Sequence, residues 1–537
     1  MAESMRGNQA LAWGALAADV RVVTGYPGSP ATGVFDALLE HTSPSEVAIG
    51  WAPNEKVAME IAIGASLGGS RALVVLKSVG MNIALDPLAT MTYTGCHRGL
   101  VILLGDDPGA WGSQNEQDSR WLAKVAEVPV VEPTSVAQAA ALMAQAFAWS
   151  EAVGTPIIVR ITRALALAVG EPEDPWTLPR ARGRFLRKRN RWVSLPYVAV
   201  RKHHMLHARL RQMTSMFETS PYDLSTGSGR LGIVGVGYAH RKVQLALGPE
   251  AERFRLLALS SVWPLPGEAV RTWLGRVDRL LVVEEGEPFV EDALAALAHR
   301  ASLSVEILGK DSRALPREGE LTLADIVGGV RTLDPTLRRT APDEPPPEMA
   351  AERPLCPDCP YRPTVEALIA AMDELGGRDR YIVVGETGCM VRANLPPYDL
   401  FDVKYSLGSG LGLGLGLAQS DRTHKVVALL GDSSFFHSDL NALPYAVQQD
   451  LPMVAIVLDN GTMALTGGQP HPGSHRDERG QERPHVDLGT LIRGAGVTPA
   501  DCAAERPEEL AAALRVGLAA DRLSVILVRG PCPRHTR

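Results

Sequence analysis

The feature that most constrains the fold of this chain is a series of short, continuous apolar runs. They recur along nearly the whole sequence, and each run ends in polar or glycine residues. RALVVLKS at 71–78 and GLVILLGDD at 99–107 are two of them, and KVVALLGD and MVAIVLDN follow much later in the chain. Stretches with helical periodicity, such as residues 54–69, lie between the runs. Short runs that are apolar throughout are typical of strands buried on both faces of a parallel sheet. Strands that alternate with helices in this way predict an α/β protein.

The pattern is interrupted at two places, which divide the chain into three α/β blocks. We predict three doubly wound, mostly parallel-sheet domains at residues 1–175, 229–332 and 355–537. Residues 176–228 form a strongly basic linker with a helical segment, and residues 333–354 form a Pro/Glu-rich linker. The basic segment is either a solvated linker or a docking strip for an acidic partner.

The glycine-rich segment LGSGLGLGLGLA at 407–418 is compatible with two structures. Its strict alternation of glycine and leucine is the pattern of a strand. Its glycines would also let a helix pack closely against a sheet or a diphosphate, and this second interpretation is the one we adopt.

Composition narrows the functional classes. The formal net charge of −7 indicates no nucleic-acid partner, because such a partner requires a broad basic surface. The apolar runs are far shorter than the roughly 18 residues of a membrane span, and the N-terminus lacks the apolar core of a signal peptide. Six cysteines in 537 residues are not the disulfide framework of a secreted protein. We therefore expect a cytoplasmic enzyme that binds no nucleic acid and no membrane.

The most specific chemical signal lies at the ends of two neighbouring predicted strands. Gly431 and Asp432 follow KVVALL, and Asp459 and Asn460 follow MVAIVL, so the two polar ends are 460 − 432 = 28 residues apart. That gap accommodates one helix and a return strand, which brings both ends to the carboxyl edge of the sheet, where ligands bind in such folds. Carboxylate, amide and carbonyl oxygens together suit Mg²⁺ that bridges a diphosphate.

These residues resemble the thiamine-diphosphate signature, with Ser433 in place of its glycine and Asp459 in place of its first asparagine. GYPGSP at 25–30, NEKVAMEIAIGAS, GDDPGAWGSQNEQDSR, CPDCPYR and LTGGQPHPG complete the resemblance, in order and over nearly the whole chain. Together they look like the large (alpha) subunit of indolepyruvate ferredoxin oxidoreductase. This family implies a pyrimidine-binding thiamine-diphosphate domain first, a transketolase-C-like domain second, and a domain that binds the diphosphate and Mg²⁺ last.

The resemblance also implies roles for single residues. Mg²⁺ would be held by Asp432, Asn460 and the backbone carbonyl of Thr462, and Glu55 would be the catalytic glutamate that hydrogen-bonds the aminopyrimidine ring. Other predicted cofactor contacts, from the same motifs, are Gly431, Ser433, Thr466 and Gly467. Candidates on the substrate side are Ser29, which matches a residue that touches the substrate carboxylate in related enzymes, and Gln114, Asn115, Arg120 and His437. The polar run that contains Gln114, Asn115 and Arg120 is also compatible with a hydrogen-bonded loop, and His437 with a structural histidine.

The implied reaction is the oxidative decarboxylation of an aryl-2-oxo acid to an acyl-CoA, with coenzyme A as co-substrate and electrons passed to ferredoxin or a similar carrier. The implied partners are a small (beta) subunit and that carrier, in a hetero-oligomer that contains a dimer of this chain. Members of the family usually carry a ferredoxin-like tail with closely spaced cysteines, whereas this chain ends at Arg537, five residues after Cys532. This departure leaves a non-oxidative 2-oxoacid decarboxylase as the alternative. A non-catalytic subunit is disfavoured because Glu55 and Asp432 are both present.

Four of the six cysteines are candidates for one [4Fe–4S] cluster. Cys356 and Cys359 form a CxxC, Cys389 follows 389 − 359 = 30 residues later, and Cys532 comes after the last predicted strand. Related 2-oxoacid oxidoreductases hold a proximal cluster with similar spacing, and thiolates are the general ligands of such clusters. Zinc and free thiols are the alternatives. Cys96 and Cys502 have no such placement and are predicted to be buried thiols.

Overall fold

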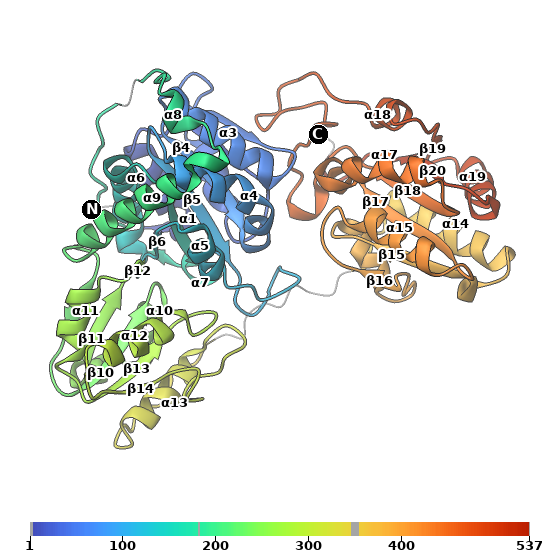
Figure 1. The fold of residues 1–537 in the computed structure, drawn as a ribbon. Coiled ribbons are helices and arrows are strands. Elements are labelled where there is room, and N and C mark those ends of the chain that lie inside the picture. Colours follow the sequence, from blue (N-terminus) through green and yellow to red (C-terminus); the bar gives the residue numbers. More distant parts are fainter. Residues whose placement is uncertain (1–3, 181–182, 345–353, 536–537) are drawn as a thin grey trace. The chain divides into compact units, whose positions relative to one another are not determined.

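The computed structural model describes residues 4–180, 183–344 and 354–535, and it has the predicted α/β architecture. The chain forms two compact units, one of Met1–Gly50 with Glu55–Met349 and one of Trp51–Asn54 with Ala350–Arg537. Figure 1 labels their elements. Residues 345–353 of the predicted Pro/Glu-rich linker lie outside the described residues. Among the described residues, no helix is both long enough and apolar enough to cross a bilayer.

The first unit contains a seven-stranded sheet with the order β12-β6-β7-β5-β4-β2-β3. Its registered pairs are parallel except for β12, which runs antiparallel to β6. The strands are β2 (Val22–Gly25), β3 (Ala48–Trp51), β4 (Ala72–Lys77), β5 (Leu100–Asp106), β6 (Val130–Val131), β7 (Ile157–Thr162) and β12 (Ser261–Trp263). The helices are α1 (Gly7–Ala17), α2 (Thr32–Glu40), α3 (Glu55–Gly68), α4 (Ser78–Thr94), α5 (Arg120–Ala126), α6 (Val136–Val153) and α7 (Arg163–Leu167). The short strands β1 (Met5–Arg6) and β8 (Val169–Gly170) pair separately.

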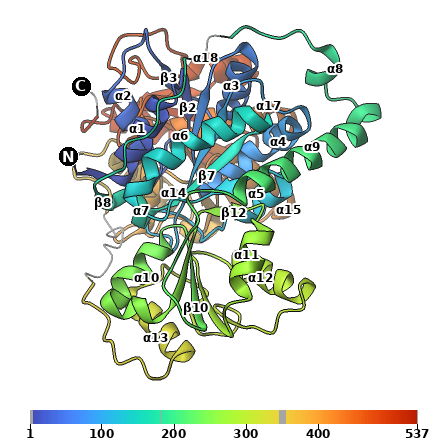
Figure 2. The same cartoon turned by 90° about the vertical axis from the view of Figure 1, so that its left-hand side faces the viewer.

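A second, five-stranded sheet of the same unit has the order β14-β13-β10-β11-β9. In Figure 2, α10 and α13 lie on one side of its strands and α11 and α12 on the other, as in a doubly wound sheet. The strands are β9 (Leu224–Thr226), β10 (Leu231–Val236), β11 (Arg255–Leu259), β13 (Arg279–Val283) and β14 (Glu306–Leu308). The helices are α10 (Ala239–Leu247), η1 (Gly248–Arg253), α11 (Gly267–Leu274), α12 (Phe289–Arg300) and α13 (Leu323–Leu333). The basic segment before β9 contains α8 (Arg189–Trp192) and α9 (Pro196–Phe217).

One strand departs from the predicted division of the chain. Strand β12 lies between β11 and β13 in sequence, within the predicted second domain, yet it pairs with β6 at the edge of the first sheet. The sequence did not predict this strand, because the strand position at the edge of another sheet is decided by tertiary packing.

The second unit contains a six-stranded sheet, entirely parallel, with the order β16-β15-β17-β18-β20-β19. Its strands are β15 (Tyr381–Gly385), β16 (Val403–Lys404), β17 (Lys425–Gly431), β18 (Met453–Asp459), β19 (Ala500–Ala503) and β20 (Ser524–Arg529). Its helices are α14 (Tyr361–Glu374), η2 (Arg378–Arg380), η3 (Cys389–Asn394), α15 (Gly410–Ser420), α16 (Asp432–Ser434), the π-helix η4 (Phe435–Asp439), α17 (Leu440–Gln449), η5 (Ala464–Thr466), α18 (Leu488–Gly494) and α19 (Pro507–Ala519).

Strand β17 shows why its sequence is apolar throughout. Val427 and Leu429 point into the core on one face of the sheet, and Ala428 and Leu430 into the core on the other. Successive side chains of a strand alternate between faces, so a strand covered on both sides must be apolar at every position. The glycine-rich segment is helix α15, as predicted, and Gly414 faces this sheet, where an added Cβ would lie 2.7 Å from Cε of Met453.

Candidate active site

Asp432 is the centre of a hydrogen-bonded group at the carboxyl end of β17 and β18. Its side chain is buried, and its Oδ2 accepts hydrogen bonds from the backbone N–H groups of Asn460 (3.0 Å) and Gly461 (2.8 Å). His471 Nε2 lies 3.0 Å from the same oxygen. Because β17 and β18 are neighbouring parallel strands, the sheet itself brings residues 432 and 460 together, as the 28-residue spacing predicted.

Asn460 is held in place by its own side-chain contacts. Its Nδ2 donates to the hydroxyl of Tyr361 (2.6 Å), and its Oδ1 accepts from the backbone N–H of Thr462 (3.0 Å). The Tyr361 hydroxyl donates in turn to the carbonyl of Leu458 (3.2 Å). Asp432, Asn460 and Thr462 are all buried. A carboxylate and an amide oxygen that are fixed in this way are the hard donors that Mg²⁺ prefers, so these residues fit the predicted cation.

Two buried carboxyl groups support the segment that follows Asp432. Glu386 and Asp439 have no exposed surface. Glu386 accepts from the Ser434 hydroxyl and from the backbone N–H of Gly410, both at 2.5 Å, and Asp439 accepts from the backbone N–H of Leu411 at 3.0 Å. Burial first, and the neighbouring Asp439 second, raise the pKa of Glu386 well above its usual range. This pair therefore ties the start of α15 to the turn that carries Asp432.

The remaining predicted cofactor contacts of this unit lie nearby in sequence but differ in exposure. Ser433 donates its backbone N–H to Oδ1 of Asp432 at 2.7 Å. The substrate candidate His437 is buried, and its Nδ1 lies 2.8 Å from the Ser438 hydroxyl. Thr466 ends η5 and Gly467 follows it; both are exposed, and the Thr466 hydroxyl donates to Gln469 Oε1 at 2.7 Å.

Glu55 is the first residue of α3 in the other unit, and its side chain is buried. Gly80 of α4 provides the space for it, because a Cβ at this position would lie 2.7 Å from both Cγ and Oε1 of Glu55. Real Cβ atoms do not approach other atoms so closely, so any larger residue at position 80 would displace the Glu55 side chain. The burial agrees with the role that the family resemblance assigns to Glu55.

The substrate candidates of this unit do not share one environment. Ser29, which precedes a cis proline, and Gln114 and Asn115 are exposed. Arg120 has no exposed surface in its side chain, and its guanidinium pairs with Asp118 (2.5 Å) and Glu284 (2.6 Å). Arg120 therefore lies in a buried ionic network between the two sheets of this unit.

Four cysteines line one cavity of the second unit. Cys356, Cys359, Cys389 and Cys532 surround a space of about 90 Å³, together with Tyr361, Arg392 and Asn460. None of the six cysteines forms a disulfide, and Cys96 and Cys502 are buried elsewhere, as predicted. Arg392 donates to Sγ of Cys356 at 3.8 Å. Burial raises the pKa of Cys389 to about 12, so any metal must displace its proton.

The cysteine cavity adjoins the predicted metal site. Asn460 lines the cavity, and its backbone carbonyl accepts from the N–H of Cys532 at 3.2 Å. Tyr361 also lines it and bonds to the Asn460 side chain. His471 lies in a matched motif, where the sequence left a cofactor-facing and a structural role open, whereas Tyr361, Glu386 and Asp439 had no role in the sequence prediction. Tyr361 lies two residues after Cys359, and its place in the CPDCPYR motif was the one signal that pointed to it.

Comparisons with known proteins agree with this geometry. The profile described as "Thiamine pyrophosphate enzyme, C-terminal TPP binding domain" matches residues 386–528, and that described as "Pyruvate flavodoxin/ferredoxin oxidoreductase, thiamine diP-bdg" matches residues 13–172. Together with the Asp432 site, these matches define a thiamine-diphosphate-dependent enzyme.

Full-length relatives define the family more narrowly. The chain is 33% identical over 503 residues to indolepyruvate oxidoreductase subunit IorA of Methanothermobacter thermautotrophicus, covering 91% of this chain and 80% of the relative. It is 32% identical over 570 residues to the subunit IorA of Pyrococcus horikoshii, covering 98% and 85%. Benzoylformate decarboxylase of Pseudomonas aeruginosa is 30% identical over 221 residues, or 40% of each chain. The chain belongs to the family of indolepyruvate oxidoreductase alpha subunits, and it is a subunit of a 2-oxoacid oxidoreductase that decarboxylates its substrate oxidatively.

Proposed function

We propose that this chain is the large subunit of an enzyme that converts an arylpyruvate-type 2-oxo acid and coenzyme A into an acyl-CoA and CO₂. The reaction releases two electrons and one proton for each turnover. The electrons leave through a [4Fe–4S] cluster held by Cys356, Cys359, Cys389 and Cys532, and reach ferredoxin or a similar one-electron carrier. The substrate class rests on the names of the relatives, which are indolepyruvate oxidoreductases.

The observation that carries the oxidative assignment is the position of the cysteine cavity. It shares Asn460 with the metal site, and Cys532 is hydrogen-bonded to the backbone of the same residue. A non-oxidative decarboxylase has no need of four cysteines beside its cofactor. Electrons released at the cofactor would therefore have only a short distance to travel to an acceptor within this chain.

The residues present fit thiamine diphosphate with Mg²⁺. When bound, this cofactor supplies the carbanion chemistry of decarboxylation. Asp432, Asn460 and the backbone carbonyl of Thr462 would hold the cation. His471 would orient Asp432, and Tyr361 would orient Asn460. Glu55 would hold a proton at the aminopyrimidine ring, for which a buried carboxyl group is suited.

The spacing of the cysteine sulfurs does not match a single zinc ion. A tetrahedral zinc site with Zn–S bonds of about 2.3 Å needs sulfurs about 3.8 Å apart. Within the part of the chain that the structure describes, no three of these sulfurs lie within 4.8 Å of one another. A cubane cluster spreads its four ligands more widely than one ion does, and thiolates are its usual ligands.

Metal analysis of anaerobically purified protein tests the cluster. We expect about four iron and four sulfide per chain. Cys389→Ser should lose most of both, whereas Cys502→Ser, which removes a buried thiol of the same unit outside the cavity, should keep them. Protein without iron that releases aldehyde and CO₂ without an electron acceptor would instead establish the decarboxylase.

A substrate panel tests the remaining parts of the proposal. Reduction of a one-electron acceptor should require coenzyme A and should be faster with aryl than with alkyl 2-oxo acids. The relatives are named as subunits, so we expect the isolated chain to turn over poorly and to gain activity with a small (beta) subunit, in a hetero-oligomer that contains a dimer of this chain. Full activity of the isolated chain would contradict the partner.

A further inference from the structure

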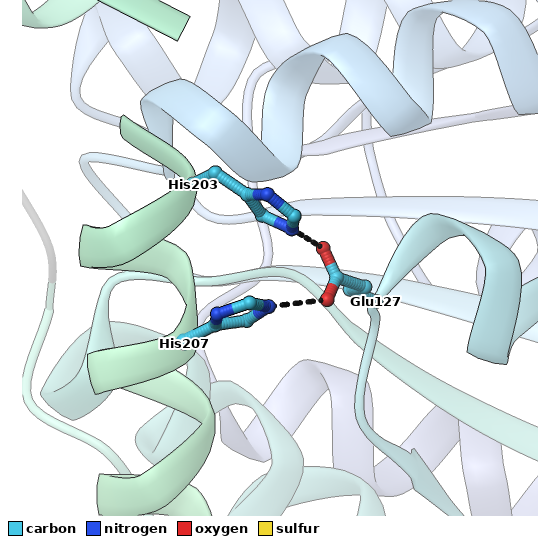
Figure 3. A group of neighbouring side chains, drawn as sticks. All are labelled: Glu127, His203 and His207. Atoms are coloured by element: carbon cyan, nitrogen blue, oxygen red, sulfur yellow. Dashed lines mark hydrogen bonds and ion pairs between the residues drawn. The ribbon is translucent and has the colours of Figure 1, made fainter. Parts of the chain in front are cut away.

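Away from the residues discussed so far, three side chains with metal-ligand atoms meet on the first unit. Nε2 of His203 lies 2.7 Å from one carboxylate oxygen of Glu127, and Nε2 of His207 lies 2.9 Å from the other. The three ligand atoms all lie within 4.8 Å of one another, and they form the one such group found among the described residues. Figure 3 shows both imidazole rings projecting from the same helix toward the Glu127 carboxylate.

The helix places the two histidines side by side. α9 buries Leu206, Met213 and Phe217 and packs against α4 and α6. His203 and His207 are four residues apart and therefore occupy adjacent turns on one face of α9, beside this buried stripe. Two histidines at this spacing on a helix can bind one metal ion from the same side.

Neighbouring groups restrict the movement of all three side chains. The His203 ring stacks on Tyr93 of α4, with centroids 5.1 Å apart and planes at 23°, and it lies 4.2 Å from the His207 ring. Arg209, on the next turn of α9, donates to the carbonyl of Thr92 and so fixes the helix against α4. Glu127 follows α5 with a left-handed backbone, φ 56° and ψ 45°, a conformation uncommon for residues other than glycine.

We propose that Glu127, His203 and His207 form a binding site for a divalent transition-metal ion of the Zn²⁺ type. Each imidazole would give its Nε2 lone pair to the ion and keep its proton on Nδ1, and Glu127 would give one oxygen. The three side chains are 24–44% exposed, which leaves room for a water molecule as fourth ligand of a tetrahedral site.

The ligand set determines which cations fit. Two imidazoles and one carboxylate favour late first-row ions such as Zn²⁺, Ni²⁺ and Cu²⁺, whereas Mg²⁺ and Ca²⁺ prefer sites made of oxygen alone. This preference separates the site from the Asp432 site, whose donors are oxygens. Without an ion, the same residues make two half-exposed hydrogen bonds, which contribute at most about 1 kcal/mol.

The ion would join two separate parts of the first unit. Glu127 directly follows α5, a helix beside the first sheet. Helix α9 belongs to the segment that connects the first sheet to the second. Because the ion binds the folded arrangement, it would clamp this connecting segment and stabilise the unit against unfolding. The proposal assigns the ion no part in the decarboxylation.

Zinc binding to the full chain tests the proposal. The protein is first freed of transition metals that a mild chelator removes, then titrated with ZnCl₂ and separated from unbound zinc. X-ray absorption at the zinc edge distinguishes this site from the cysteines, because nitrogen and oxygen neighbours lie at about 2.0–2.1 Å and sulfur neighbours at about 2.3 Å. We expect one zinc per chain with nitrogen and oxygen neighbours, and a higher unfolding temperature when it is bound.

Variants of α9 supply the matched comparison. His207→Ala and His203→Ala should each lose the nitrogen- and oxygen-bound zinc and the rise in unfolding temperature. Glu127→Gln should bind zinc at least about tenfold more weakly. Residues that only orient a metal ligand already contribute about tenfold to affinity, and Glu127 would be a ligand itself. His204→Ala, which removes an exposed histidine next to the cluster, should behave like the wild type. The proposal is overturned if saturated wild-type protein holds zinc only on sulfur or not at all. It is also overturned if His207→Ala keeps the nitrogen- and oxygen-bound zinc.

Discussion

Replacing Tyr361 with Phe isolates the contribution of one hydroxyl group to the metal site. This hydroxyl accepts the Nδ2–H of Asn460 at 2.6 Å, and the tyrosine ring is 4% exposed. In the variant the Asn460 amide loses this partner in a place that water reaches poorly. A buried donor left without its partner costs about 1–3 kcal/mol. For a unit the size of Ala350–Arg537, each kcal/mol corresponds to a fall in Tm of roughly 2–4 °C.

The same substitution should also weaken the binding of the metal ion. Asn460 is one of the predicted Mg²⁺ ligands, and Tyr361 is the group that orients it. Loss of a group that orients a metal ligand typically weakens metal affinity by about 10–100-fold. We therefore expect the affinity for Mg²⁺ and thiamine diphosphate to fall by that factor, while kcat at saturating cofactor changes much less.

Tyr398→Phe is the matched control, because it also removes a single tyrosine hydroxyl in the same unit. Its hydroxyl donates to Glu366 at 2.6 Å, but that carboxylate is 54% exposed, so water can replace the lost donor. The change in stability should stay within about 0.5 kcal/mol. Cofactor affinity can be measured by calorimetric titration and Tm by thermal unfolding. If Tyr361→Phe binds Mg²⁺ and thiamine diphosphate as tightly as Tyr398→Phe does, Tyr361 does not orient a metal ligand.

Four further predictions concern single residues. Asp432→Ala should abolish the retention of thiamine diphosphate; normal cofactor content in the purified variant would refute the metal site. Glu55→Gln should retain the cofactor but lose about 10²–10⁴-fold in rate, with slower exchange of the thiazolium C2 proton. Gly80→Ala should lower the rate in the same way by displacing the Glu55 side chain, unlike Gly64→Ala, whose Cβ meets nothing within 4 Å. Arg120→Met should lower the free energy of unfolding by about 3–5 kcal/mol, because it leaves buried carboxylates uncompensated. A fall in kcat/KM with unchanged stability would instead assign Arg120 to the substrate site.

The sequence predicted best which residues lie close together where those residues follow strands. Asp432 and Asn460 follow β17 and β18, and a parallel sheet brings the ends of neighbouring strands together whatever the rest of the chain does. The same reasoning holds for the four cysteines, which lie in loops or helix starts around this edge. The helical interpretation of residues 407–418 was also confirmed, because the glycines that weaken a strand allow α15 to lie close to the sheet.

The residues that the sequence did not predict depend on contacts between distant segments. Arg120 stands in a polar run after β5, which is also where a substrate ligand would stand. Its partner Glu284 is 164 residues away, and no local pattern shows that the two will be buried together. The pairing of β12 with β6 and the contact of Glu386 with Ser434 are of the same kind. Local sequence gives the type of an element, whereas such partners are decided by tertiary packing.

The arrangement of the second unit explains why one edge of a sheet can serve two chemical purposes. β18 leads directly into Asn460, β20 leads to Cys532, and β15 is followed by the turn that carries Cys389. The pair Cys356 and Cys359 directly precedes α14, whose first residue is Tyr361. In an all-parallel sheet these strand ends lie on the same side. The predicted oxygen ligands of Mg²⁺ and the four cysteines therefore lie close to one another. Tyr361 belongs to both places, since it follows the cysteine pair in sequence and bonds Asn460 in space. If the four cysteines hold the proposed cluster, this proximity would place an electron acceptor beside the cofactor.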